Sequence, residues 1–162
     1  MNIRISMDNR KETIETLAKL YCTSSYTEGF ETILEASEGI GKASMRLFEL
    51  RSGFELIISS MDQRQNLIAD IEEKGSQLII SFCLSGKMRV SFRDQKDDFI
   101  VGHGQNMLCF TPRSMCTTEY PSGQTYDYVS VRIEPRVLNG FYPGQENDAL
   151  GNRGRDQSYG PD

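Results

Sequence analysis

The chain is poor in the residues that metal sites and acid–base catalysts need: its 162 residues include a single histidine, His103. A first-row metal ion held by side chains needs three or four converging ligands. Ser–His–Asp or Cys–His catalysis would also have to recruit this one residue, which stands between two glycines. We therefore expect a turn histidine, with a ligand contact as the alternative, and neither catalytic residues nor a cofactor.

Long apolar runs, paired cysteines and basic clusters are also missing. No apolar stretch approaches the roughly 20 residues of a membrane span, and the first residues lack the apolar core of a secretory signal. The four cysteines form no C-x-x-C pair, so buried reduced thiols are expected. The net charge is −5 and the basic residues are scattered, which disfavours nucleic acid. We expect a cytoplasmic chain that binds neither membrane nor, by itself, DNA.

The chain does contain short β-type runs separated by turn signals such as Ser52-Gly53, Ser85-Gly86 and Ser122-Gly123. A spacing of about 8–12 residues between such runs is typical of a sandwich or barrel. Its interior would act as a container, which favours sensing or binding over chemistry. Strands are expected at residues 44–50, 54–61, 67–71, 77–84, 88–92, 99–101, 107–111, 116–120 and 126–133.

Two of these runs show which faces are apolar. In residues 77–84 both alternating faces are mostly apolar, which is typical of a central strand covered on both sides. In residues 126–133 the valines and Ile133 oppose a face carrying Tyr126, Tyr128, Ser130 and Arg132. One face of this second strand should meet the core and the other should meet water or ligand.

The two ends of the chain differ from this β-rich middle. Apolar residues at helical spacing predict a helix from Arg10 to Cys22, whereas residues 29–35 fit a helix or a turn. Pro135 is suited to the first turn of a short helix. Residues 143–162 are rich in Gly, Asn, Asp and Gln and predict a linker or tail. We therefore divide the chain into an N-terminal helical segment (1–38), a barrel (39–142) and a tail (143–162).

Two motifs that suggest chemistry have simpler explanations. Residues 36–44, ASEGIGKAS, approach a phosphate-binding loop, but Ala36 and Ala43 stand where glycine and Ser/Thr are needed, and a strand is expected to follow. The sequence favours a glycine-rich turn. The pairs Glu72-Glu73 and Asp97-Asp98 are adjacent, so on a strand they point to opposite faces and predict solvated turn charges.

Three architectural motifs carry a resemblance to a known family: an apolar strand with L-x-G and a second strand at 82–90, G-x-G…F-x-P at 102–112, and V-x-V-x-I-x-P-x-x-L at 129–138. Over residues 38–142 the chain resembles the N-terminal effector domain of AraC-type bacterial transcription regulators, in the branch similar to the pyochelin-sensing regulator. The resemblance implies a mostly β, cupin-like (jelly-roll, double-stranded β-helix) barrel.

It also implies a function and partners. Such a domain binds a small-molecule effector, often forms a homodimer, and controls DNA binding by a C-terminal helix-turn-helix domain that this chain lacks. In the pyochelin branch the effector is a ferric siderophore, whose metal arrives already chelated. The alternatives are a small cupin-fold enzyme, such as an isomerase or dioxygenase, and a structural dimerisation module.

Effector-binding candidates are polar or aromatic residues near expected strand ends. An arginine at a barrel mouth suits a carboxylate or another oxyanion. The candidates are Arg46, Phe48, Arg64, Arg89, Tyr126, Tyr128 and Arg132.

Overall fold

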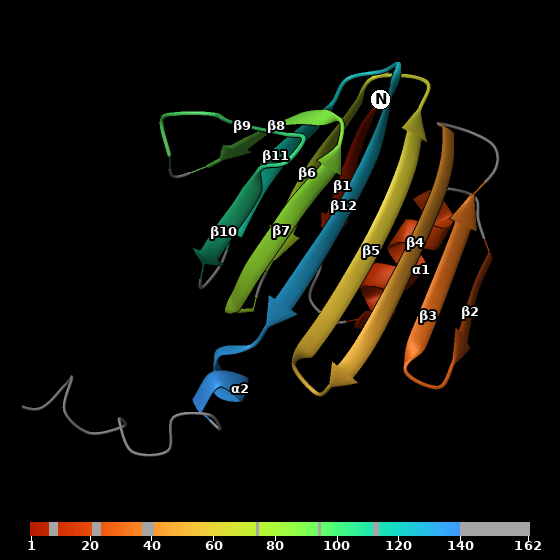
Figure 1. Cartoon of the computed structure of the whole chain (residues 1–162), viewed down its shortest axis with the longest axis vertical. Coiled ribbons are helices and arrows are strands. Elements are labelled where there is room, and N and C mark those ends of the chain that lie inside the picture. The colour runs from red at the N-terminus through yellow and green to blue at the C-terminus, as the bar shows by residue number, and fades with distance from the viewer. Residues whose placement is uncertain are drawn as a thin grey trace, which may run out of the picture.

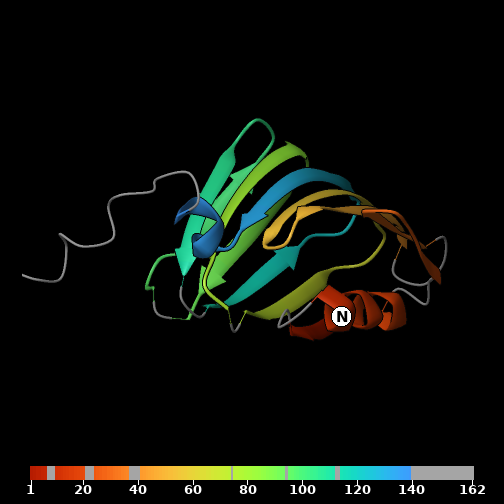
Figure 2. The ribbon, with the colours of Figure 1, turned by 90° about the horizontal axis from the view of Figure 1, so that it is seen from below.

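Two β-sheets face each other in the computed structural model (Figures 1 and 2), which describes residues 1–6, 10–20, 24–36, 41–73, 75–93, 95–111 and 114–139. One sheet has the strand order β10-β7-β12-β5-β4-β3-β2 and the other β1-β6-β11-β8-β9. The elements are β1 (Asn2–Ser6), α1 (Arg10–Leu20), β2 (Ser24–Glu28), β3 (Glu31–Ala36), β4 (Gly41–Arg51), β5 (Phe54–Gln63), β6 (Leu67–Glu73), β7 (Gln77–Ser85), β8 (Lys87–Phe92), β9 (Phe99–Gly102), β10 (Asn106–Thr111), β11 (Ser114–Tyr120), β12 (Gln124–Ile133) and α2 (Pro135–Asn139).

The eight strands from β5 to β12 form a jelly roll. Within the larger sheet the order is β10-β7-β12-β5, and facing it lies β9-β8-β11-β6. All pairs among these strands are antiparallel. This is the strand order of a double Greek key closed as two sheets. The predicted mostly β, cupin-like barrel is confirmed by this topology.

All nine expected strands are present, each extended by up to three residues at its ends. The predicted helix at the N-terminus is found as α1 and the short helix after Pro135 as α2. The glycine-rich segment leads into β4, so its described end begins a strand and not the helix that a phosphate-binding loop needs. Turn chemistry and alternation were sufficient to locate these elements.

The description of residues 1–38 as a helical segment was wrong in part, because three strands accompany α1. β1 pairs in parallel with β6, from Asn2 opposite Ile68 to Ser6 opposite Glu72. The segment left open between helix and turn, 29–35, holds the turn at Gly29, with a φ of 60°, and most of β3, which forms a hairpin with β2. β3 then pairs with β4, so the larger sheet continues across the expected boundary. The expected tail, 143–162, lies outside the described residues.

The expectation for residues 77–84 holds in one respect and fails in another. β7 is central in its half of the sheet, between β10 and β12. Its inner side chains Ser81 and Cys83 are buried, but the outer side chains Phe82 and Leu84 are 43% and 54% exposed. Figure 1 shows this outer face toward the viewer, with no described helix or strand lying across it. Within the described residues, the strand is therefore covered on one side only.

The β7–β8 turn makes a strict demand for glycine. Gly86 has a φ of +86°, and a Cβ there would lie 2.6 Å from the Tyr126 ring and 2.8 Å from the Thr125 carbonyl oxygen. We expect Gly86→Ala to lower the free energy of unfolding by about 3 kcal/mol, since backbone strain of about 1–2 kcal/mol adds to overpacking. Gly104→Ala is the control, with a φ of +75° and open space around the added Cβ. It should cost only about 1 kcal/mol in urea unfolding, and equal losses would contradict the packing argument.

Candidate functional site

A cavity of about 180 Å³ lies between the two sheets. Members of two buried clusters line it: Leu67, Val90 and Tyr120 belong to one, and Leu47 belongs to the other. Strands of both sheets and α1 contribute to its wall. The lining residues are Ile3, Ile5, Thr13, Leu17, Met45, Leu47, Ile57, Met61, Leu67, Ala69, Ile71, Ile79, Ser81, Met88, Val90, Met107, Cys116, Thr118, Tyr120, Tyr128, Ser130 and Arg132.

The polar part of this wall comes mainly from β12. Tyr128, Ser130 and Arg132 alternate along the strand and all line the cavity. Ser130 Oγ lies 2.7 Å from Ser81 Oγ of β7 in a buried hydrogen bond. Arg132 is only 7% exposed, so its guanidinium is held in an environment where charge is expensive unless it is paired. An arginine at such a wall favours a ligand with an oxyanion.

Tyr128 connects the arginine to the centre of the barrel. Burial raises its pKa above the usual tyrosine range, while Ser59, the Arg132 charge and Tyr120 each act in the opposite direction. Ser59 is itself buried on β5, and its Oγ makes no fully formed hydrogen bond among the described residues. Burial outweighs these three opposing effects. The phenol therefore stays protonated and able to donate to a bound group.

Most of the remaining wall is apolar and adaptable. Four methionines line it: Met45, Met61 and Met107 on the larger sheet and Met88 on the smaller. Methionine is unbranched and polarizable, so it fits irregular shapes and changes rotamer readily. A cavity of this size is comparable to an engineered cavity of about 150 Å³ that accepts benzene. The wall therefore suits a small, partly apolar molecule.

The N-terminal segment closes one side of the cavity. Thr13 and Leu17 of α1, with Ile3 and Ile5 of β1, belong to the lining. Figure 2 shows α1 on the inner side of the larger sheet, beside the half formed by β2, β3 and β4. A ligand in the cavity would therefore touch a helix that lies outside the jelly roll.

A second, larger hollow lies at the opposite edge of the sandwich, between the edge strands β9 and β10. This edge cleft has a volume of about 710 Å³ and an aromatic wall. Phe92 and Phe99 meet edge to face there, with ring centroids 6.0 Å apart. Among the residues that the structure describes, no charged side chain lines the cleft. Its polar groups are the amides of Gln95, Gln105 and Asn106.

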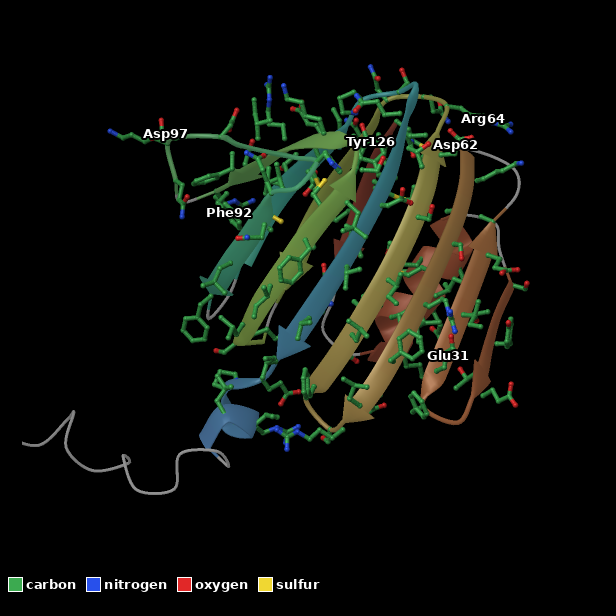
Figure 3. All side chains as sticks on the ribbon, in the orientation of Figure 1. Glu31, Asp62, Arg64, Phe92, Asp97 and Tyr126 are labelled. Atoms are coloured by element: carbon green, nitrogen blue, oxygen red, sulfur yellow. The ribbon has the colours of Figure 1, made fainter. Side chains whose placement is uncertain are left out.

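Two of the seven predicted effector contacts, Tyr128 and Arg132, line the cavity. Tyr126 is inward-facing too, but it has a structural role: its hydroxyl donates to the Pro121 carbonyl oxygen at 2.6 Å, and its ring packs edge-on against Tyr120 at 5.2 Å. Figure 3 shows Tyr126 near the upper end of the sandwich.

The other four candidates do not join them. On the outer face of β4, Arg46 pairs with Glu31 at 2.5 Å and its guanidinium lies 5.2 Å from the Phe48 ring centre. The hydrogen bond to Glu31, then the charge of Glu31, raises the Arg46 pKa. Arg89 on β8 lies 4.0 Å from Glu119, and both are well exposed. Arg64 is exposed in the β5–β6 turn, at the edge of the molecule in Figure 3.

His103 lies in the β9–β10 turn, as predicted, and its Nδ1 donates to the Leu84 carbonyl oxygen at 2.5 Å. Three cysteines in the described part of the chain carry free thiols; Cys83 is buried, which raises its pKa, and Cys109 and Cys116 are half-buried. Cys22 lies outside the described residues.

Among the described residues, no three His, Cys, Asp or Glu side chains gather closely enough to hold a metal ion. Neither α1 nor α2 has the length and apolar character needed to cross a bilayer.

Sequence reasoning missed most of the polar wall. Ser81 and Thr118 lie on strands that were predicted correctly, but a small hydroxyl between apolar residues gives little signal. Ser130 was placed on the right face of its strand without being chosen as a candidate. The alternation of Tyr128, Ser130 and Arg132 was the one pattern that could have identified the wall.

An eight-stranded jelly roll around a lined cavity defines the class: a cupin-like β-barrel domain. More specifically, the chain belongs to the family of the regulatory protein PchR N-terminal domain, whose model matches residues 40–157. The predicted resemblance to effector domains of AraC-type regulators of the pyochelin branch is thereby confirmed. No curated protein matches the chain.

The similar solved structures are distant. They include the Cnp3 cupin domain from Schizosaccharomyces pombe, at 9% identity over 65% of this chain and 70% of that one, with a TM-score of 0.47. A cupin 2 conserved barrel domain protein from Salinispora arenicola is 11% identical over 67% and 88%, with a TM-score of 0.46. An HTH_3 family transcriptional regulator from Vibrio cholerae is 14% identical over 57% and 52%, with a TM-score of 0.40. The fold assignment rests on the strand order of this chain.

Proposed function

We propose that this regulatory domain senses a small molecule bound in the cavity between its sheets, and that the bound state controls a DNA-binding domain elsewhere in the regulator. The observation that carries the proposal is the cavity itself: about 180 Å³, lined by both sheets, with Arg132 and Tyr128 on one wall. A jelly roll with a fully packed interior would have no space between its sheets for a ligand.

The wall chemistry narrows the effector class. A carboxylate or similar oxyanion would meet the Arg132 guanidinium and the Tyr128 hydroxyl, and an aliphatic or aromatic body would meet the methionines. Pockets for drug-sized ligands usually measure about 300–1,000 Å³. The cavity is smaller, so the effector it suits is a small organic acid with an apolar body.

Regulation would begin at α1. Thr13 and Leu17 lie in the same wall as the effector, so occupancy changes what this helix packs against. A ligand shifts a two-state arrangement only as far as its affinities for the two states differ. We propose that the effector favours one position of α1 over another and that the DNA-binding domain responds to that position.

A ferric siderophore remains a second candidate effector, and the volume of the edge cleft favours it. A chelated metal complex exceeds the interior cavity, whereas about 710 Å³ lies within the range for ligands of that size. The aromatic rings of Phe92 and Phe99 would stack on flat ligand groups, and the chelator would hold the iron without protein ligands.

An enzymatic role is less well supported by the site. Among the described residues, the cavity wall offers hydroxyls, the Cys116 thiol and one guanidinium, but no carboxylate or imidazole to move a proton. A cupin-type isomerase or dioxygenase would instead hold a metal. Near-stoichiometric Fe, Mn, Ni or Zn in protein purified without chelators would favour an enzyme over a sensor.

Thermal unfolding against a ligand panel tests the proposal. The panel contains small aliphatic and aromatic acids, their amides, sugars, and metal-free and ferric siderophores. A ligand at about 100 times its dissociation constant should add roughly 2.7 kcal/mol to the free energy of unfolding. We expect a saturable rise with an acid and none with its amide. A rise confined to a ferric siderophore would move the site to the edge cleft, and a flat response would contradict effector sensing by this chain.

A further inference from the structure

The outer face of the larger sheet carries a continuous apolar patch across β10, β7, β12 and β5. Backbone pairing aligns its side chains in three rows that run across the four strands. Asn106 is the single polar member among twelve positions, and none is charged. The rows, which we call the outer patch, are Leu108-Ile80-Val131-Leu56, Phe110-Leu78-Ile133-Phe54 and Asn106-Phe82-Val129-Ile58.

The outer patch is exposed in the single chain. Leu108 is 68% exposed, Phe110 60%, Phe82 43% and Ile58 38%, although each sits in a regular, well-paired strand. The strand β7 has apolar side chains on both faces, a pattern typical of strands that are covered on both sides. The sequence of this sheet is thus suited to a cover that the described chain does not provide.

The size of the outer patch fits the centre of a protein interface. Four strands about 4.8 Å apart and three rows about 6.8 Å apart give a plan of about 19 by 20 Å, or about 390 Å². A standard interface takes about 800 Å² from each partner, with an apolar centre and a polar rim. The rim is present: Arg46 and Glu31 lie beyond β5 on β4 and β3, and Asp127 lies beyond the third row on β12.

The occupant that this surface fits best is a second copy of the chain. A two-fold axis in the plane of the face would place apolar rows on apolar rows, with no charge among the twelve positions to repel its own copy. Two sheets pack in this way at about 10 Å, as in β-sandwiches. The chain's own residues 140–162 offer five apolar side chains, Phe141, Tyr142, Ala149, Leu150 and Tyr159, too few to cover twelve positions in three rows.

We propose that the outer patch is a homodimer interface, formed by face-to-face packing of the larger sheets of two chains. This specifies the surface behind the dimerisation expected of the family, and it does not require the cavity to be occupied. Because β12 contributes its outer side chains to the patch and Arg132 to the cavity, the two sites share one strand.

Sedimentation equilibrium of this chain tests the interface. The wild-type chain should be dimeric at micromolar concentration. Phe82→Glu places a charge on β7, between two other strands of the patch, and Leu108→Glu places one on the edge strand β10. Both side chains are already exposed. Each variant should raise the dimer dissociation constant at least about 100-fold. Ile100→Glu is the matched control, since Ile100 is 53% exposed on β9 of the other sheet; it should leave the dimer unchanged.

Circular dichroism confirms that each variant is folded, and the ligand-induced rise in unfolding midpoint is measured on the same samples. That rise should persist in the Phe82→Glu variant, because Phe82 lines neither the cavity nor the edge cleft. Its persistence separates failure of the interface from failure of the sensor. A wild-type chain that is monomeric at several hundred micromolar would overturn the proposal. So would a dimer that survives both patch variants, or one that Ile100→Glu disrupts equally.

Discussion

Replacing Arg132 with methionine should weaken acid binding strongly while leaving the fold intact. Removing one partner of a buried, hydrogen-bonded charge pair costs about 2–4 kcal/mol, equivalent to about a 30- to 1,000-fold weaker effector. Stability should fall by a smaller amount, because methionine removes the buried charge together with its desolvation cost, which offsets the loss of the interaction that Arg132 makes within the chain. Isothermal titration with the acid identified by the panel measures the first effect, and urea unfolding measures the second.

Arg89→Met is the matched control for that experiment. Arg89 is half exposed on the outer face of β8, with Glu119 4.0 Å away. Exposed pairs of this kind contribute about 0–1 kcal/mol. Effector affinity should be unchanged in this variant. An Arg132→Met chain that binds the acid as tightly as wild type would contradict the proposed contact between the ligand's oxyanion and Arg132.

Filling the cavity should have the second large effect. Ala69 of β6 is 2% exposed and lines the cavity, so leucine there adds three carbon atoms to the empty space. Filling a third of about 180 Å³ is worth about 1.4 kcal/mol at about 24 cal/mol per Å³. We expect Ala69→Leu to raise the free energy of unfolding by about 1 kcal/mol and to reduce effector binding below detection.

Ala69→Ser controls for the change at this position, because serine adds a single oxygen and leaves most of the cavity open. Its dissociation constant for the effector should stay within about tenfold of the wild-type value, which is a change of at most about 1.4 kcal/mol in binding free energy. A chain with leucine at position 69 that is more stable and still binds would show that the effector occupies another site. A loss of stability in that variant would show that the cavity cannot accept the side chain.

The strands were predictable because alternation and turn glycines are local properties. β5 to β12 each carry a clear apolar face or run, and Gly53, Gly86 and Gly123 mark three of their turns. β1 was missed because its alternation is limited to Ile3 and Ile5. β2 was missed because all five of its residues are exposed, so burial leaves no pattern in them.

The site was less predictable because it depends on which face of each strand turns inward. Arg46 and Arg132 both sit in β-type runs, yet pairing sends Arg46 to the outer face and Arg132 to the cavity. The two strands differ in the face that turns inward. On β4 the inner face carries the apolar Leu47, whereas on β12 the inner face carries the polar side chains. Strand pairing between residues far apart in sequence decides this, and no short window contains it.

The central claim, that an effector enters the space between the sheets, is tested most directly by methyl NMR of methionine-labelled protein. Met45, Met61, Met88 and Met107 line the cavity, whereas Met115 lies on the outer side of the smaller sheet. Saturating effector should shift the first four methyl signals and leave that of Met115 in place. Met107 also borders the edge cleft, so a shift of Met107 alone would place the ligand there. A tightly bound effector that leaves all four signals unmoved would contradict the account.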